Sequence, residues 1–371
     1  MSSDRKTALL HYWLTGMRGG ENVLNEFCRM FPDAKIFTHA AIPANLTGPV
    51  LQHKLHESLI ARLPGGRTHC QKYLPLMPSA LKKWDFSSYD LIISSESGPV
   101  KGINKPANIP HICYCHTPMR YVWDLYDTYY NQSGLLGKLA MRTFRKTLQH
   151  YDLKSAECVD FFIANSQFVK ERIRRIYGRD ALVVHPPVDT EFFQKTDSEK
   201  RDIYLFAGQL VPYKHPDIVL KAFSVLNREK LIIVGQGPMK KYLQKIATPN
   251  VTFCSNITRE ELRKLYASAK ALLFPGIEDF GIVPVEAQAA GCPVIAMGKG
   301  GALETVIPGK TGLFMKNQSP EDLLNCIEES AACTFDPFLM QQHIQQFSIA
   351  KFHANISGII QKLTGSALTT D

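Results

Sequence analysis

The feature of this 371-residue chain that most constrains its fold is a repeated alternation of short apolar runs with longer amphipathic ones. Several short runs lack polar alternation, which is typical of parallel strands buried on both faces. Segments with helical spacing separate them, for example Glu21–Phe31, Glu260–Ala269 and Val283–Ala290. The predicted strands are Ala8–Trp13, Lys35–His39, Tyr89–Ser94, His111–Cys115, Phe161–Asn165, Leu182–His185, Tyr204–Gly208, Leu231–Gly235, Val251–Cys254, Ala271–Phe274 and Pro293–Met297. Repeated strand–helix units predict an α/β fold with parallel sheets and helices on both faces.

Two such series meet near His185–Asp189, where adjacent prolines and a polar run from Gln194 to Asp202 indicate a linker. The chain also exceeds the roughly 250–300 residues at which a single core stops growing. We therefore expect two Rossmann-like domains, 1–184 and 185–346, with a cleft between them. Ligands of such sheets bind beyond the carboxyl ends of the strands, so the cleft is the expected site.

Charge is distributed unevenly between these halves. The chain holds 43 Lys and Arg against 34 Asp and Glu, a net charge of +9. Residues 1–184 hold 24 basic and 15 acidic residues, so the whole surplus lies there, and residues 185–371 are neutral. A basic surface suits nucleic acid, a membrane or a phosphorylated substrate. A nucleic-acid-binding protein remains a distant alternative, because no recognition module is visible, and we expect no nucleic-acid partner.

Cysteine usage and the start of the chain favour a cytoplasmic protein. No run approaches the roughly 18 apolar residues of a membrane-spanning helix, and the polar start does not suggest a signal peptide. Nine scattered cysteines indicate reduced thiols. His111, Cys113 and Cys115 alternate on one strand, but their spacing matches no standard zinc pattern, so core packing is favoured. We expect neither a metal nor a bound cofactor.

The strongest chemical signal is a pair of acids, Glu278 and Glu286, eight residues apart around a helix start. Backbone N–H groups of Gly281, Ile282 and Val283 are expected to form an anion site at the helix N-terminus. Carboxylates in these positions can accept hydrogen bonds from the hydroxyls of a sugar and a ribose. A loop with two solvated acids is the alternative reading.

Two further turns follow predicted strands in the second half. Lys214 comes after Gly208 and Gln209, where its ammonium could lie on a diphosphate, although a lone lysine in a loop is usually just solvated. Gly235 opens the turn into the next helix, and a plain strand-to-helix turn explains that pattern equally well. The interpretation of Lys214 as a ligand of the diphosphate is favoured because its strand end is expected to face the cleft.

The first half carries a glycine turn and a histidine at strand ends. Arg18, Gly19 and Gly20 follow the first strand, where glycines allow backbone N–H groups to approach a phosphate or a sugar. The sequence there is not a dinucleotide fingerprint, so a dinucleotide cofactor is not favoured. His116 ends another predicted strand, with Arg120 just beyond it; alone, such a histidine is more often structural than catalytic.

Together these motifs resemble retaining glycosyltransferase family 4, whose fold is GT-B. The resemblance covers essentially the whole chain and rests on Glu278–Glu286, Lys214, His185–Phe193, Asn165-Ser166 and the glycine turn after the first strand. The segments most similar to the bacterial O-antigen mannosyltransferase branch are His11–Trp13, Met17–Glu21, Ile93–Gly98 and Cys115–Asp124. The resemblance implies a C-terminal helix packed back on the N-terminal domain, which residues 347–371 would complete.

The resemblance also implies roles for individual residues. Glu286 would bind the donor ribose, Glu278 the transferred sugar, and Lys214 the diphosphate. His116 would lie beside the reacting sugar. The remaining donor-side residues would be Gly208, Gln209, Gly235, Gly281, Ile282 and Val283, and the phosphate or acceptor side would hold Arg18, Gly19, Gly20 and Arg120. The family usually has arginine at Gln209, and either Arg18 or Arg120 would compensate for the missing charge.

The implied reaction is transfer of a hexose with retention, with GDP-mannose favoured as donor and a lipid-linked oligosaccharide of cell-surface polysaccharide synthesis as acceptor. A UDP-sugar donor remains an alternative. The N-terminal domain would bind the acceptor and the C-terminal domain the donor. Lys138, Arg142, Arg145 and Lys146 recur at helical spacing, which suits either an anionic membrane or an ordinary solvated face. Peripheral association with the inner face of the plasma membrane is therefore expected.

Overall fold

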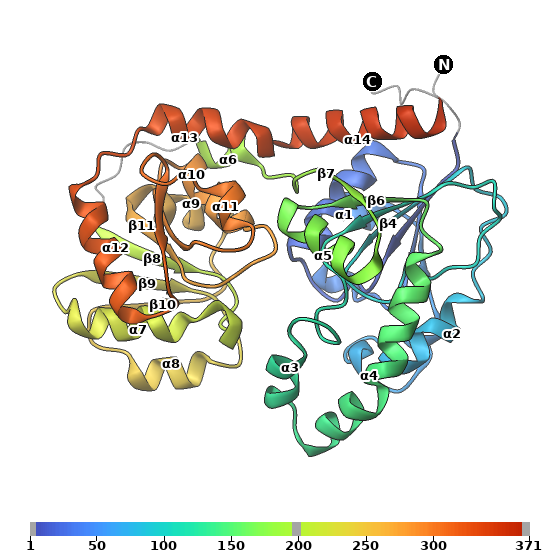
Figure 1. Ribbon diagram of the computed structural model, residues 1–371, viewed down its shortest axis with the longest axis horizontal. Coiled ribbons are helices and arrows are strands. Elements are labelled where there is room, and N and C mark those ends of the chain that lie inside the picture. Colours follow the sequence, from blue (N-terminus) through green and yellow to red (C-terminus); the bar gives the residue numbers. More distant parts are fainter. Residues whose placement is uncertain (1–4, 195–201, 366–371) are drawn as a thin grey trace. The chain divides into compact units, whose positions relative to one another are not determined.

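The structure is a computed structural model that describes residues 5–194 and 202–365. Most of the predicted polar linker, residues 195–201, lies outside these ranges. The chain divides into two compact units, which are coloured by sequence in Figure 1. Unit 1 comprises Met1–Pro187 with Phe352–Asp371, and unit 2 comprises Val188–Lys351. Each unit contains one parallel sheet with helices, as the repeated strand–helix pattern predicts.

The sheet of unit 1 has seven parallel strands in the order β3-β2-β1-β4-β5-β6-β7. Its strands are β1 (Thr7–His11), β2 (Lys35–Thr38), β3 (Leu55–Glu57), β4 (Leu91–Glu96), β5 (His111–Cys115), β6 (Phe161–Ala164) and β7 (Ala181–Val183). Its helices are α1 (Gly19–Met30), α2 (Met77–Leu81), α3 (Tyr126–Gln132), α4 (Leu135–Ala156) and α5 (Gln167–Tyr177). The central strands β1, β4 and β5 are buried throughout, which explains why their sequences lack alternation.

The sheet of unit 2 has six parallel strands in the order β10-β9-β8-β11-β12-β13. Its strands are β8 (Ile203–Ala207), β9 (Lys230–Val234), β10 (Val251–Cys254), β11 (Ala269–Phe274), β12 (Val294–Met297) and β13 (Gly312–Met315). Its helices are α6 (Thr190–Gln194), α7 (Pro216–Val225), α8 (Lys240–Ile246), α9 (Arg259–Ser268), α10 (Ile282–Ala289), α11 (Ala302–Thr305), α12 (Pro320–Ala332) and α13 (Pro337–Ile344). Caps mark several helix starts; the Thr258 hydroxyl accepts from Glu261 N, and the Glu261 carboxylate accepts from Thr258 N.

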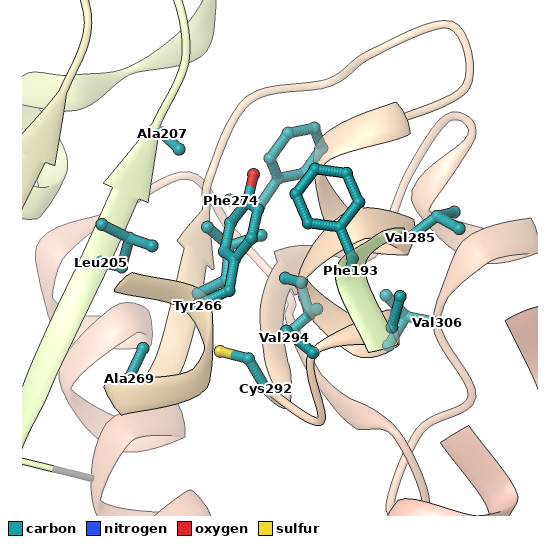
Figure 2. Close-up of a cluster of buried hydrophobic side chains, with 14 of the residues drawn as sticks. Phe193, Leu205, Ala207, Tyr266, Ala269, Phe274, Val285, Cys292, Val294 and Val306 are labelled. Carbon is teal, nitrogen blue, oxygen red and sulfur yellow. The ribbon is translucent and has the colours of Figure 1, made fainter. Parts of the chain in front are cut away.

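The core of unit 2 supports its binding edge. Phe193 of α6 packs against Tyr266 of α9, with ring centroids 5.7 Å apart. Figure 2 shows both rings in a cluster with Leu205 of β8, Phe274 of β11 and other side chains that are nearly or fully buried. Since this cluster includes β8, β11 and α10, it fixes the strand ends and the helix start that carry the predicted donor residues.

The final helix, α14 (Ile349–Thr364), contributes to the core of unit 1 from Phe352 onward. The Phe352 ring lies 5.5 Å from that of Phe27 and 5.8 Å from that of Tyr114. Ile356 and Ile360 belong to the same buried cluster. The predicted return of the C-terminal helix to the N-terminal domain is therefore confirmed.

A buried charge cluster ties α4 to the sheet of unit 1. The Lys101 ammonium lies 3.0 Å from Glu96 Oε1 and 2.6 Å from Asp152 Oδ1, and all three side chains are at most 1% exposed. Trp123 and Tyr177 donate further hydrogen bonds to Asp152. Because these ion pairs and hydrogen bonds satisfy its buried charges, the cluster fixes the second half of α4 against the strand ends.

Candidate functional site

In unit 2, Lys214 and Glu278 form an ion pair at the carboxyl ends of two neighbouring strands. Lys214 lies in a short 3₁₀ turn (Pro212–Lys214) after β8, and Glu278 lies in the loop after β11. The Lys214 Nζ is 2.8 Å from Glu278 Oε1, and the side chains of Lys214 and Glu278 are 17% and 16% exposed. Both residues line a small pocket together with Ala207 and Phe274. The ammonium is therefore held in place yet remains accessible to an anionic ligand.

Close backbone approach shapes this edge of unit 2. A Cβ on Gly208 would lie 3.4 Å from Lys214 Nζ, so the ammonium sits directly over this residue. Gly235, with φ of 155°, lies so near that a Cβ there would be 1.9 Å from the Gly208 carbonyl oxygen. Only glycine fits at position 235. Gln209, which follows Gly208, is exposed.

The N-terminus of α10 begins beside Glu278. Gly281 precedes the helix with φ of 101° and ψ of 70°, a left-handed conformation that favours glycine. The helix starts at Ile282, as predicted, and the first-turn amides of Ile282 and Val283 have no acceptors within the helix. These N–H groups and the positive end of the helix dipole suit a phosphate or a sugar oxygen.

Glu286 lies in the second turn of α10. Its Oε2 accepts a 3.1 Å hydrogen bond from the hydroxyl of Tyr266, a fully buried residue of α9. Burial raises the pKa of the Glu286 carboxyl to about 7; the Tyr266 hydrogen bond and the charge of Arg259 oppose this shift, and Asp189 adds to it. Glu286 is therefore held in a fixed position and is close to half-ionised at neutral pH.

In unit 1, His116 follows the end of β5. Its Nε2 lies 2.9 Å from the Ser95 hydroxyl, and its carbonyl accepts a 2.9 Å hydrogen bond from Asn165 Nδ2. Burial lowers the pKa of His116 to about 3, helped by the charges of His11 and Arg120. His116 is thus a neutral imidazole at physiological pH, which can accept or donate a hydrogen bond but carries no charge.

The glycine turn of unit 1 lies against this histidine. α1 begins at Gly19, and a Cβ on Gly20 would lie 3.4 Å from His116 Nε2 and 3.2 Å from the Tyr12 hydroxyl. The exposed Arg18 precedes the helix. The structure therefore brings Gly20 and His116 together, and it places both proposed compensating cations, Arg18 and Arg120, in unit 1.

The alternating histidine and cysteines of β5 are core residues, as expected. His111 Nε2 lies 2.8 Å from the Ser94 hydroxyl, and its Nδ1 lies 3.1 Å from the carbonyl of Cys158. Cys113 and Cys115 pack in a buried apolar cluster. Within residues 5–194 and 202–365, no group of three or more His, Cys, Asp or Glu side chains is placed to hold a metal ion. None of the helices described is long and apolar enough to cross a membrane.

Sequence reasoning missed three residues that build these sites. Tyr266 fixes Glu286, Ser95 contacts His116, and Gly276 allows the loop after β11 to pass Lys214, since a Cβ there would lie 2.8 Å from the Lys214 Cα. Each acts across a long sequence separation. Gly276 left a visible signal in the Pro-Gly pair of its loop, and Ser95 lies within the Ile93–Gly98 segment of the resemblance, whereas Tyr266 left none.

Two family models match this chain. Residues 17–192 match "Glycosyltransferase Family 4" and residues 188–334 match "Glycosyl transferases group 1". A D-inositol 3-phosphate glycosyltransferase of Streptomyces bingchenggensis is 28% identical over 319 residues, 68% of this chain and 70% of the relative. A GDP-mannose-dependent alpha-(1-6)-phosphatidylinositol monomannoside mannosyltransferase of Mycolicibacterium smegmatis is 33% identical over 197 residues, 45% of this chain and 52% of the relative. Across these two and four further D-inositol 3-phosphate glycosyltransferases, the alignments span from 44% to 70% of each relative's own length.

The solved structure of Anabaena HepE in complex with UDP-glucose has a similar fold. Its TM-score is 0.71 at 18% identity, and the match covers 96% of this chain and 99% of that one. The two Rossmann-like units and the similarity to this structure show that the chain has the GT-B fold. Its first half is similar to family 4 glycosyltransferases, and its second half is similar to group 1 glycosyl transferases.

Proposed function

We propose that this glycosyltransferase moves a hexose from a nucleotide-diphosphate sugar to a lipid-linked oligosaccharide, with retention of anomeric configuration. GDP-mannose is the favoured donor, and cell-surface polysaccharide synthesis of the O-antigen type is the favoured setting. The observation that carries the proposal is the Lys214–Glu278 ion pair beside the N-terminus of α10, with Glu286 one turn further on. The mannosyltransferase relative named above supports mannose as the sugar.

The donor is assigned to unit 2. Lys214 and the amides of Ile282 and Val283 would stabilise the charge that develops on the leaving diphosphate. Glu286 would accept a hydrogen bond from a ribose hydroxyl. Glu278, held by Lys214 at 2.8 Å, would contact the transferred sugar. Gly208 and Gly235 would keep the backbone close to the phosphates, and their neighbour Gln209 would contribute a neutral hydrogen bond in the turn.

The acceptor is assigned to unit 1. The neutral His116 would contact a hydroxyl of the reacting sugar, because an uncharged imidazole suits a hydroxyl better than a phosphate. Gly19 and Gly20 would present backbone N–H groups to a phosphate or to the acceptor. Either Arg18 or Arg120 would supply the positive charge that Gln209 lacks.

The proposed reaction is a front-face substitution. The bond between the anomeric carbon and the leaving phosphate oxygen breaks, and the acceptor oxygen attacks the oxocarbenium-like carbon from the same face. The leaving phosphate oxygen takes the acceptor proton. Glu278 therefore positions the sugar and is not a nucleophile, which agrees with its engagement by Lys214.

A UDP-sugar is the second candidate donor. The observation in its favour is the fold similarity to HepE, whose solved structure holds UDP-glucose. The residues assigned to ribose and diphosphate serve either nucleotide, so the base must be distinguished elsewhere.

A nucleotide panel tests the proposal. We expect GDP and GDP-mannose to raise the melting temperature of the purified protein more than UDP and UDP-glucose do; the reverse order would replace GDP-mannose by a UDP-sugar. Incubation with the preferred donor and a bacterial lipid extract should yield a glycosylated lipid, and NMR of the product should show the anomeric configuration of the donor. Absence of any nucleotide-dependent shift would refute the donor site.

A further inference from the structure

The first turns of α4 contact α3 and expose their leucines. Leu135, Leu136 and Leu139 are 89%, 85% and 63% exposed, whereas Leu148 and Asp152, further along the helix, are buried. In Figure 1 the start of α4 extends away from the sheet of its unit, next to α3. Three adjacent exposed leucines at a helix tip form the kind of apolar patch that marks an interaction surface.

The apolar tip continues into a basic stripe on the same helix face. Leu135, Leu139, Arg142 and Lys146 follow the spacing i, i+4, i+7 and i+11, which places them on one side of a helix. All four are exposed. A ligand that meets this face therefore contacts leucines at the helix start and cations one to two turns later.

The charged side chains between Asp127 and Asp152 all have one sign. Residues 128–151 hold four Lys or Arg and no Asp or Glu. Arg145 is used internally, since its guanidinium stacks at 3.8 Å on the Tyr126 ring of α3, and Lys138 lies 5.5 Å from the Tyr130 ring. Across the described parts of the chain, no ion pair or hydrogen bond engages the side chains of Arg142 or Lys146.

We propose that this surface, the apolar tip Leu135, Leu136 and Leu139 with the basic collar Arg142 and Lys146, inserts into an anionic lipid surface. A bilayer interface presents acyl chains below a layer of phosphates. Along one helix face, the apolar tip would meet the acyl chains and the basic collar would meet the phosphates. Interfacial helices bury their apolar side chains roughly 5–10 Å deep. The first turn of α4 holds no acidic residue, and its helix dipole adds positive charge at the same end. This inference takes from the proposed function only the expectation that the acceptor is linked to a lipid.

Vesicle sedimentation tests the surface. The probes are vesicles of phosphatidylcholine alone and of phosphatidylcholine with phosphatidylglycerol. Replacing the three leucines of the tip by serine is expected to weaken binding to the anionic vesicles by at least about 100-fold. R142Q combined with K146Q is expected to weaken it by about 30-fold, because each cation near an anionic surface contributes about fivefold. The collar variant should also lose most of the salt dependence.

Matched controls come from elsewhere on unit 1. Serine in place of Leu51, Leu59 and Leu76 removes three leucines that are 51%, 46% and 53% exposed, and K82Q with K83Q removes two exposed cations. Both controls should bind vesicles like the wild type. The proposal is overturned if the wild-type protein does not bind anionic vesicles, or if the tip variant binds them as well as its control does. It is also overturned if the wild-type protein is a dimer without lipid and the tip variant is a monomer. The nucleotide-induced melting shift should be unchanged in all variants; its loss in the wild type would refute the proposed function and leave the vesicle result standing.

Discussion

Donor binding should weaken as the pH falls through 7, because the ionised carboxylate of Glu286 accepts a hydrogen bond from ribose more strongly than the protonated acid does. Burial raises its pKa to about 7, so the weakly accepting protonated form prevails below that pH. Apparent affinity scales with the competent fraction. With that pKa the ionised fraction is about one-eleventh at pH 6 and about ten-elevenths at pH 8. The dissociation constant for GDP-mannose should therefore rise about tenfold from pH 8 to pH 6.

The same pKa shift predicts that Glu286→Gln stabilises the protein at alkaline pH. The folded pKa of about 7 exceeds the ordinary value of 4.5, so the stabilising contribution is present at low pH and is lost as the pH rises through 7. Glutamine keeps an oxygen for Tyr266 and never ionises. A full shift of this size corresponds to about 3 kcal/mol. Because Glu286 is partly exposed, we expect the variant to gain about 2 kcal/mol at pH 8 and nothing at pH 4.

Calorimetric titration with GDP-mannose and urea denaturation, both over the pH range, check this prediction. The diphosphate of a nucleotide sugar has no proton that titrates near neutrality, so the ligand does not mask the effect. Glu328→Gln, an exposed change on α12, is the matched control and should leave both curves unchanged. A pH-independent dissociation constant in the wild type, or a Glu286→Gln variant that retains the wild-type pH dependence, would refute the reasoning.

Three further substitutions test the site and the core. Lys214→Met should lower the transfer rate by about 100-fold or more and change the free energy of unfolding by less than about 1 kcal/mol, because the ion pair is partly exposed; wild-type turnover would contradict its assignment to the diphosphate. Lys101→Met leaves two buried carboxylates without their cation, and the free energy of unfolding measured by urea denaturation should fall by about 3–5 kcal/mol. A fall of less than about 1 kcal/mol would disprove the stabilising role of Lys101. Gly235→Ala forces a Cβ to 1.9 Å from a backbone carbonyl; the circular-dichroism melting temperature should fall sharply, and an unchanged value would show that the turn can relax.

The buried parallel strands were predictable because their apolar runs are visible without any tertiary information. Each predicted strand is present, with ends shifted by at most two residues. The missed strands are β3 and β13, of three and four residues, which lie at sheet edges. Leu55–Glu57 is only half-buried and contains a histidine and a glutamate, so it carries no apolar run. Gly312–Met315 does carry one, Leu-Phe-Met, which the sequence analysis missed. The other two edge strands, β7 and β10, are equally short and were predicted, so edge position alone does not explain the two misses.

The side-chain contacts of the site were much less predictable. The motifs placed Lys214, Glu278 and Glu286 at strand and helix ends, but not the 2.8 Å ion pair between the first two. The contact between Tyr266 and Glu286 joins two helices, and nothing near either residue indicates it. Helical periodicity likewise predicted the basic character of α4. Only tertiary packing decides that its first leucines are exposed and that Leu148 and Asp152 are buried.

The return of α14 to unit 1 has a consequence for how the chain folds during synthesis. The hydrogen bond between His353 Nε2 and Glu26 Oε2 joins residues 327 positions apart, beside the contact of Phe352 with Phe27. Unit 2 is one continuous segment that can fold as soon as it leaves the ribosome, whereas unit 1 has to wait for the last helix. The half of the chain that is made first is therefore completed last, and until then its aromatic core lacks the contacts of Phe352.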